Sequence, residues 1–134
     1  MSSQSQLPSL IPDQEILSRF VLTKNWIRSD NSIRHHAFMP PADLNLSVTA
    51  STKLSEENIW QIGLDVAQKR PNGELKGRAD ITALNVRSQE LEAVPDPIPD
   101  TNIHHVHIIG WSAEKPLQKI KALELADAAH FVPS

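Results

Sequence analysis

The chain contains no cysteine among its 134 residues. This absence excludes disulfide bonds, thiolate nucleophiles and cysteine-type zinc sites, and it fits a reducing cytosol. Long hydrophobic runs are also missing, because no stretch approaches the roughly 18 apolar residues that a membrane span needs. At the N-terminus, no basic start leads into an apolar segment as a secretory signal requires. We therefore expect a soluble, cytoplasmic protein with no membrane partner.

Concentrated positive charge is absent as well. The chain has 13 Lys and Arg against 16 Asp and Glu, a net charge of −3 and a pI near 6.0. Its basic residues are scattered in twos, such as Lys69-Arg70, and such a distribution gives no general attraction to a polyanion. We therefore do not expect nucleic-acid binding. With 40% hydrophobic residues, a chain of this length can bury the core of one domain.

The first residues differ from the rest of the chain. Residues 1–13 are polar, contain two prolines and show no hydrophobic period, so they predict a flexible N-terminal arm that is dispensable for folding. Leu10 and Ile11 are the residues of this arm that could dock on the domain or on a partner. Residues 14–134 are expected to form a single domain.

Strand patterns occur in several places. Residues 43–50 alternate, with Leu44, Leu46 and Val48 on one face and polar side chains on the other, as a half-buried strand requires. The prolines of residues 95–100 predict an exposed loop. Further strands are expected at 20–23, 91–94 and 104–109.

Two segments read as main helices. Residues 55–69 begin with Ser55 as a good N-cap and keep their apolar residues on one arc, whose core face is expected to comprise Ile59, Ile62 and Val66. Pro116 suits the first turn of a second helix that runs to about His130. The segment that Gly77 opens predicts one or two helical turns. The order of elements predicts a small α+β domain with a mainly antiparallel sheet and two main helices.

Three of the six histidines lie within residues 104–107 of the last expected strand. Because successive strand residues point to opposite faces, His105 and His107 share one face and His104 lies on the other. Two adjacent imidazoles can hold a metal, bind an anion or pass protons. A zinc site needs three or four ligands, and nothing forces His35, His36 or Glu114 to complete one. No metal or other cofactor is therefore predicted.

Arginines are the second candidate feature. Arg78, between Gly77 and Asp80, could present its guanidinium to a phosphate or carboxylate. The alternative is a surface turn in which Asp80 caps the next helix. Arg34 could add positive potential to the same site. Among the tryptophans, Trp60 is expected in the core, whereas Trp26 and Trp111 are better placed for stacking or interface contacts.

The histidine strand also resembles part of a known motif. His105-Val106-His107-Ile108-Ile109-Gly110 is similar to the second half of the His-φ-His-φ-His-φ-φ motif of the histidine-triad nucleotide hydrolases and transferases, where φ is hydrophobic. The resemblance implies His105 as a nucleophile at phosphorus and His107 as a ligand of the phosphate oxygens. The family's first histidine falls on Ile103, and one of its hydrophobic positions falls on His104.

A wider resemblance links the chain to a group of small uncharacterised bacterial proteins with no assigned activity. It is carried by the strings at 34–41, 46–48, 57–63, 77–80 and 105–111. It implies a single domain, with any site at Arg34, Ser47, Arg78, Asp80 and His105.

Together these patterns predict a small binding or interaction domain. Its ligand, a small anion or a protein partner, is expected at a His/Arg patch comprising Arg34, Arg78, Asp80, His105 and His107. The alternative is a small hydrolase or transferase of phosphoesters or nucleotides, with His105 and His107 as catalytic candidates. An enzyme would need both imidazoles in a concave site with a third oriented group, whereas a binding domain would not.

Overall fold

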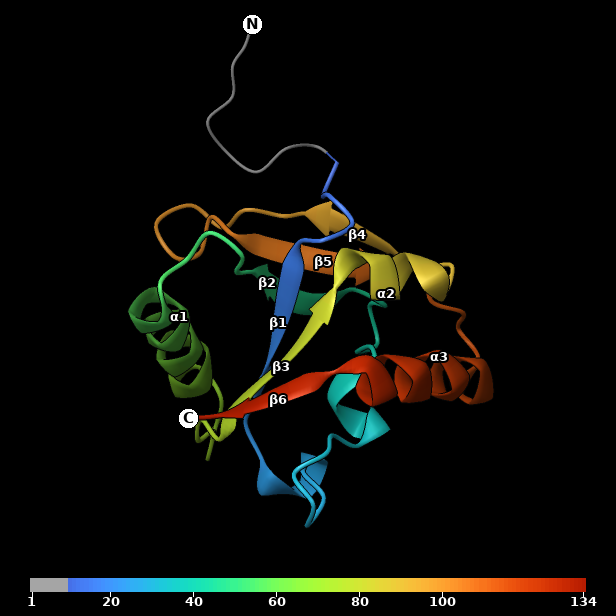
Figure 1. Ribbon diagram of the computed structural model, residues 1–134, viewed down its shortest axis with the longest axis horizontal. Helices are drawn as coiled ribbons and strands as arrows, with labels where there is room; N and C mark the ends of the chain where they lie inside the picture. The colour runs from blue at the N-terminus through green and yellow to red at the C-terminus, as the bar shows by residue number, and fades with distance from the viewer. Residues whose placement is uncertain (1–9) are drawn as a thin grey trace, which may run out of the picture.

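Six strands form one antiparallel sheet in the computed structural model, which describes residues 10–134 (Figure 1). Their order across the sheet is β4-β5-β2-β1-β3-β6, and every neighbouring pair is antiparallel. The single α+β domain expected from the sequence is confirmed. The strands are β1 (Ile16–Val21), β2 (Leu46–Ala50), β3 (Gly77–Thr82), β4 (Glu92–Pro95), β5 (His105–Ile109) and β6 (His130–Pro133).

Three α-helices and two 3-10 turns complete the described fold. The helices are α1 (Glu56–Gln68), α2 (Ala83–Ser88) and α3 (Lys115–Ala128), and the turns are η1 (Lys24–Trp26) and η2 (His35–Phe38). Ser55 caps α1 as predicted, because its side chain accepts a hydrogen bond from the Asn58 amide. Among the described helices, none has the length and apolar character that crossing a bilayer requires.

The two faces of the sheet carry cores of different size. On one face, Leu17 and Val21 of β1 join a large cluster that includes Phe38 of η2 and Leu125 of α3. Phe20 belongs to a smaller cluster on the other face, with Ile59 and Ala67 of α1. Because the cross-strand register pairs Ser18 with Thr49 and Thr49 with His105, the predicted histidine pair lies on the α1 side of the sheet.

The contact of α1 with the sheet differs from the expected one. Ile59 is buried as expected, together with Gly63 and Ala67, and the expected Ile62 and Val66 are partly buried and pack against the same cluster. The reason is steric, since a Cβ atom on Gly63 would lie 2.8 Å from the Phe20 ring. Small residues therefore let the helix approach this ring closely.

The region around Arg78 was also predicted incorrectly. The helical turns exist as α2, but Gly77–Thr82 forms strand β3, pairing with β1 on one side and β6 on the other. Thr82 caps α2 in a reciprocal capping box with Asn85, so the alternative in which Asp80 caps the next helix is wrong. Strand β6 was not predicted, because its four residues directly follow the α3 pattern.

Residues 11–13, which were predicted as part of a flexible arm, are fixed to the domain. Leu10 is exposed, but Ile11 is completely buried in the large core. Arg87 holds the same segment, since its guanidinium donates to the Ile11 carbonyl and pairs with Asp13 at 2.6 Å. Residues 11–13 therefore belong to the domain. Residues 1–9 lie outside the described part of the chain.

Candidate functional site

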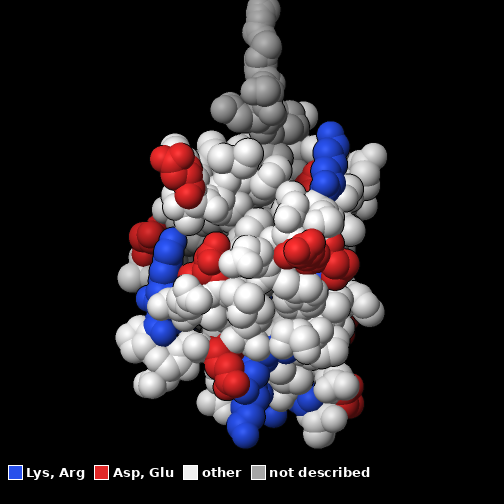
Figure 2. All heavy atoms as spheres, turned by 90° about the vertical axis from the view of Figure 1, so that its left-hand side faces the viewer, with Lys and Arg blue, Asp and Glu red and all other residues white. Residues whose placement is uncertain are grey.

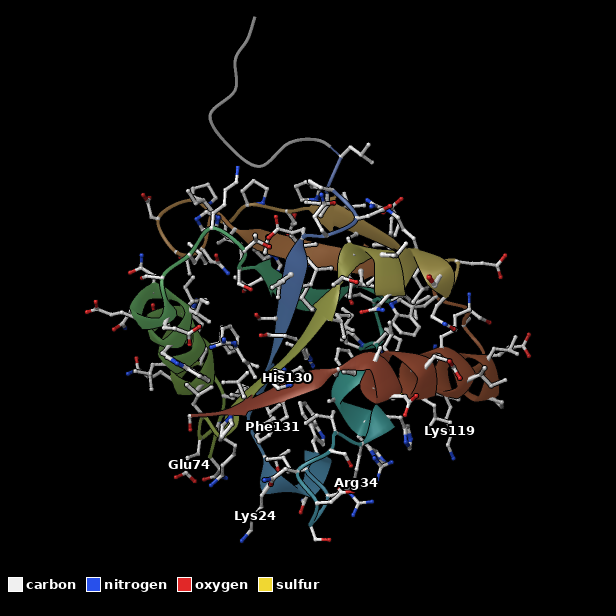
Figure 3. All side chains as sticks on the ribbon, in the orientation of Figure 1. Lys24, Arg34, Glu74, Lys119, His130 and Phe131 are labelled. Atoms are coloured by element: carbon white, nitrogen blue, oxygen red, sulfur yellow. The ribbon has the colours of Figure 1, made fainter. Side chains whose placement is uncertain are left out.

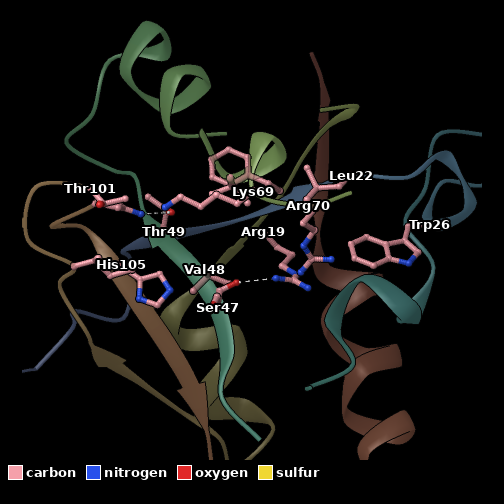
Figure 4. Close-up of a pocket in the computed structure, with 14 residues that line it drawn as sticks. Arg19, Leu22, Trp26, Ser47, Val48, Thr49, Lys69, Arg70, Thr101 and His105 are labelled. Atoms are coloured by element: carbon pink, nitrogen blue, oxygen red, sulfur yellow. Dashed lines mark hydrogen bonds between the residues drawn. The ribbon is translucent and has the colours of Figure 1, made fainter. Parts of the chain in front are cut away.

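A pocket lies where β1 and β2 separate. The two strands pair only at Leu17 with Ala50 and at Ser18 with Thr49, and β1 then continues with β3 alone. The gap opens into a cavity of about 340 Å³ (Figure 4). The residues that line it are Arg19, Phe20, Leu22, Trp26, Ser47, Val48, Thr49, Val66, Lys69, Arg70, Ile98, Thr101, Asn102 and His105.

Arg19 bridges the separated strands. Its Nε donates to the Ala37 carbonyl at 2.8 Å, and its Nη1 donates to the Ser47 carbonyl at 3.1 Å. Its guanidinium carbon lies 5.5 Å from the Trp26 ring centre. Within residues 10–134, Arg19 forms no ion pair. Burial lowers the pKa of Arg19 to about 10, and the nearby charge of Arg70 adds to this effect.

The other charges of the pocket have the same sign. Lys69 is the C-cap of α1 and Arg70 follows it, at the helix end that favours cations. In Figure 4, Arg70 lies with Arg19 and Trp26 on one side of β2, and His105 lies on the other. No described residue that lines the pocket is an aspartate or a glutamate. The pocket therefore combines three cationic side chains with polar and apolar walls.

His105 and His107 are both partly accessible, with 12% and 26% of their side chains exposed. His105 Nδ1 lies 3.0 Å from the backbone oxygen of Asp96 and 3.2 Å from its Oδ2. Because a carbonyl oxygen only accepts, this contact requires the proton on Nδ1. Nε2 of His105 then has no hydrogen-bond partner among residues 10–134 and remains free for a ligand of the pocket that His105 lines.

Arg78 and Asp80 do not join this pocket. Arg78 is only 6% exposed and donates to both oxygens of Glu56 and of Asp80, with the Trp60 ring 4.8 Å away. Burial opposes the charge of Arg78, but hydrogen bonds to the two carboxylates outweigh it and hold its pKa above the ordinary value. Both residues of the expected anion site are therefore used inside an ion-pair network.

Arg34 lies elsewhere. It precedes η2 and lines a second hollow of about 740 Å³ together with Lys24, Trp26 and His36. Figure 3 shows Arg34 and Lys24 at the end of the molecule that η1 and η2 form. His35 and His36 stack on each other with ring centres 4.1 Å apart. The predicted His/Arg patch is therefore not one surface: His105 and His107 stay together, Arg78 and Asp80 form a separate ion pair, and Arg34 lies apart from both.

Sequence reasoning missed Arg19, Lys69, Arg70 and Asp96. One signal was present, because Arg19 alternates with Leu17 and Val21 and so occupies a core-facing position of a strand. The positions of Lys69 and Arg70 depend on how α1 packs on the sheet, and that of Asp96 depends on the pairing of β4 with β5. Neither arrangement has a local sequence signature. Acidic and basic side chains are mixed on the surface around α1, so this surface carries no extended basic patch (Figure 2). The three cationic side chains that lie together are those of the pocket.

No protein-family model matches the chain, and no curated protein or solved structure matches it either. The likeness to the histidine-triad motif and the wider bacterial resemblance stay predictions.

Proposed function

We propose that this protein binds a small organic anion in the pocket between β1 and β2. The observation that carries the proposal is Arg19, a largely desolvated guanidinium whose only hydrogen-bond acceptors in residues 10–134 are backbone carbonyls. A cation removed from water without a counter-charge is unfavourable. A bound anion would supply that charge and would return the pKa of Arg19 toward its ordinary value.

The lining residues suggest the chemical class of the ligand. A guanidinium fork suits the oxygens of a carboxylate or a phosphate, and Lys69 and Arg70 add charge beside it. Trp26, Phe20 and the aliphatic side chains form walls that suit an apolar or aromatic group. The volume is at the lower end of the range for ligand pockets. The expected ligand is therefore a small carboxylate or phosphate monoester with an apolar part.

Calorimetric titration with benzoate and phenyl phosphate tests this proposal. Arg70→Gln and Lys69→Gln alter exposed side chains and should each weaken binding by about tenfold or more, as expected for loss of a charged hydrogen-bond partner. Arg19→Gln should weaken it most. Arg34→Gln is the matched control, since Arg34 lines the other hollow. Equal weakening by Arg34→Gln, or no binding of either anion at millimolar concentration, would reject the proposal.

A second candidate function is phosphoester hydrolysis or transfer, which the Asp96–His105 contact favours. Asp96 orients the ring so that the Nε2 lone pair of His105 can attack phosphorus. The P–N bond would form as the ester P–O bond breaks and the leaving oxygen takes the electron pair. Water would then release phosphate from the imidazole. Phenol release from phenyl phosphate, abolished by His105→Ala and retained by His107→Ala, would support an enzyme over a binding domain.

A further inference from the structure

We infer that Asp96, His105 and His107 form a binding site for a divalent transition metal, distinct from the anion pocket. The three residues come from the facing ends of β4 and β5, and one ligand atom from each lies within 4.8 Å of the others. The sequence predicted no metal. The inference does not depend on the proposed function: His105 borders both sites, but Asp96 and His107 do not line the anion pocket.

The backbone fixes these three side chains. His105 and His107 are two residues apart on β5 and therefore point to the same face. Asp96 directly follows β4, and its amide donates to the His105 carbonyl at 2.8 Å, which continues the strand pairing. The carboxylate is thus held opposite the two imidazoles by main-chain hydrogen bonds rather than by a mobile loop.

The separations suit a small ion. Asp96 Oδ2 lies 3.2 Å from His105 Nδ1 and 3.5 Å from His107 Nε2. In a tetrahedral zinc site with bonds near 2.0–2.1 Å, neighbouring ligand atoms are about 3.4 Å apart. The distances from Asp96 Oδ2 to each of the two histidine nitrogens are therefore close to those of a tetrahedral site. The rings stand nearly perpendicular, with centres 4.8 Å apart, and side-chain rotation can bring their nitrogens closer.

The donor set selects the kind of metal. Two imidazoles and one carboxylate suit Zn²⁺, Co²⁺ or Ni²⁺, whereas Mg²⁺ and Ca²⁺ require mostly oxygen ligands. Three protein ligands leave a coordination position for water or another ligand. Coordination through Nδ1 would move the ring proton of His105 to Nε2 and replace the contact of Nδ1 with the Asp96 carbonyl oxygen. Because protons compete with the metal for imidazole nitrogens, the affinity should fall as the pH is lowered.

Titration of the whole chain with ZnCl₂, without phosphate or carboxylate buffer, tests the site. We expect one zinc ion per chain with micromolar affinity or better, and a Co²⁺ absorption spectrum typical of tetrahedral coordination. His107→Ala and Asp96→Asn should each weaken zinc binding by about 100-fold, because each removes one of three ligands. His107 and Asp96 do not line the anion pocket, but Asp96 contacts and orients His105, which does, so His107→Ala is the variant that leaves the lining of the anion pocket intact.

Three matched controls separate this site from other binding. His104→Ala removes the neighbouring imidazole, His36→Ala disrupts the stacked pair, and Arg70→Gln alters the anion pocket. All three should retain the zinc affinity of the unmodified chain. Unchanged affinity in His107→Ala, or loss of binding in His36→Ala, would overturn the assignment. Circular dichroism of each variant identifies any that fails to fold, and His107→Gln then replaces His107→Ala.

Discussion

At the scale of single residues, Arg19 and Arg78 show how neighbours decide what a partly buried cation does. Both belong to adjacent strands of one sheet. Arg78 donates to two carboxylates and its pKa is raised, whereas Arg19 donates to backbone carbonyls, and burial together with the charge of Arg70 lowers its pKa. The first cation is satisfied within the fold, and the second is available to a ligand. The sequence could not distinguish them, because the partners Glu56 and Ala37 are remote from both arginines in the chain.

The Arg78 network gives a prediction at this scale. Asp80→Asn should destabilise the fold by about 3 kcal/mol, since it removes the better buried counter-charge of a guanidinium that is 7% exposed. Glu56→Gln should cost less than about 1 kcal/mol, because Glu56 is 68% exposed. Urea unfolding of both variants measures the difference. Equal costs would show that Asp80 is not the main partner.

At the scale of elements, the segment before β1 is a short anchor. Ile11→Ala should destabilise the protein by about 2–5 kcal/mol, because the isoleucine is fully buried in the large core. Leu10→Ala is the neighbouring control and should have almost no effect, since Leu10 is 69% exposed. Thermal denaturation of the two variants measures both effects. An equally small change in both variants would show that Ile11 does not contribute to the stability of the core.

The contact between α1 and the sheet gives another prediction. Gly63→Ala should cost about 1–3 kcal/mol, because the added methyl group would meet the Phe20 ring at 2.8 Å. The higher helix propensity of alanine, worth about 1 kcal/mol, acts in the opposite direction. Gln68→Ala on the exposed side of α1 is the control and should leave the unfolding free energy within about 0.5 kcal/mol of the original. A stabilised Gly63→Ala protein would contradict the close approach.

Elements with a strong local signal could be predicted from the sequence, and those defined by partners could not. The alternation of apolar and polar residues before Ala50 predicted β2, and the Ser55 N-cap predicted the start of α1. The positions of the prolines and histidines predicted the region of β4 and β5. Strand β3 was missed because it lies between two other strands and yet contains polar residues. One of them, Asp80, accepts a hydrogen bond from Ser18 on the neighbouring strand. The histidine pair was predicted correctly because residues two apart on a strand point to the same face. Asp96 was missed because only the pairing of β4 with β5 brings it there.

At the scale of the whole molecule, the proposed anion site would couple ligand binding to stability. It lies between β1, β2 and the end of α1, so an anion bound there contacts elements that separate when the chain unfolds. A ligand that binds only the folded state at 100 times its dissociation constant stabilises it by about 2.7 kcal/mol. For a domain of this size, such a change raises the melting temperature by several degrees.

We therefore expect phenyl phosphate to raise the melting temperature of the chain, and sodium chloride at equal ionic strength to raise it less. The rise should diminish as salt is added, because Lys69 and Arg70 are exposed to solvent and their charges are screened. In Arg70→Gln the starting temperature should stay nearly unchanged, since Arg70 is exposed, while the ligand-dependent rise should shrink. Scanning calorimetry over a range of ligand concentrations measures both quantities. A rise that persists in the Arg19→Gln, Lys69→Gln and Arg70→Gln variants would place the stabilising anion outside this pocket.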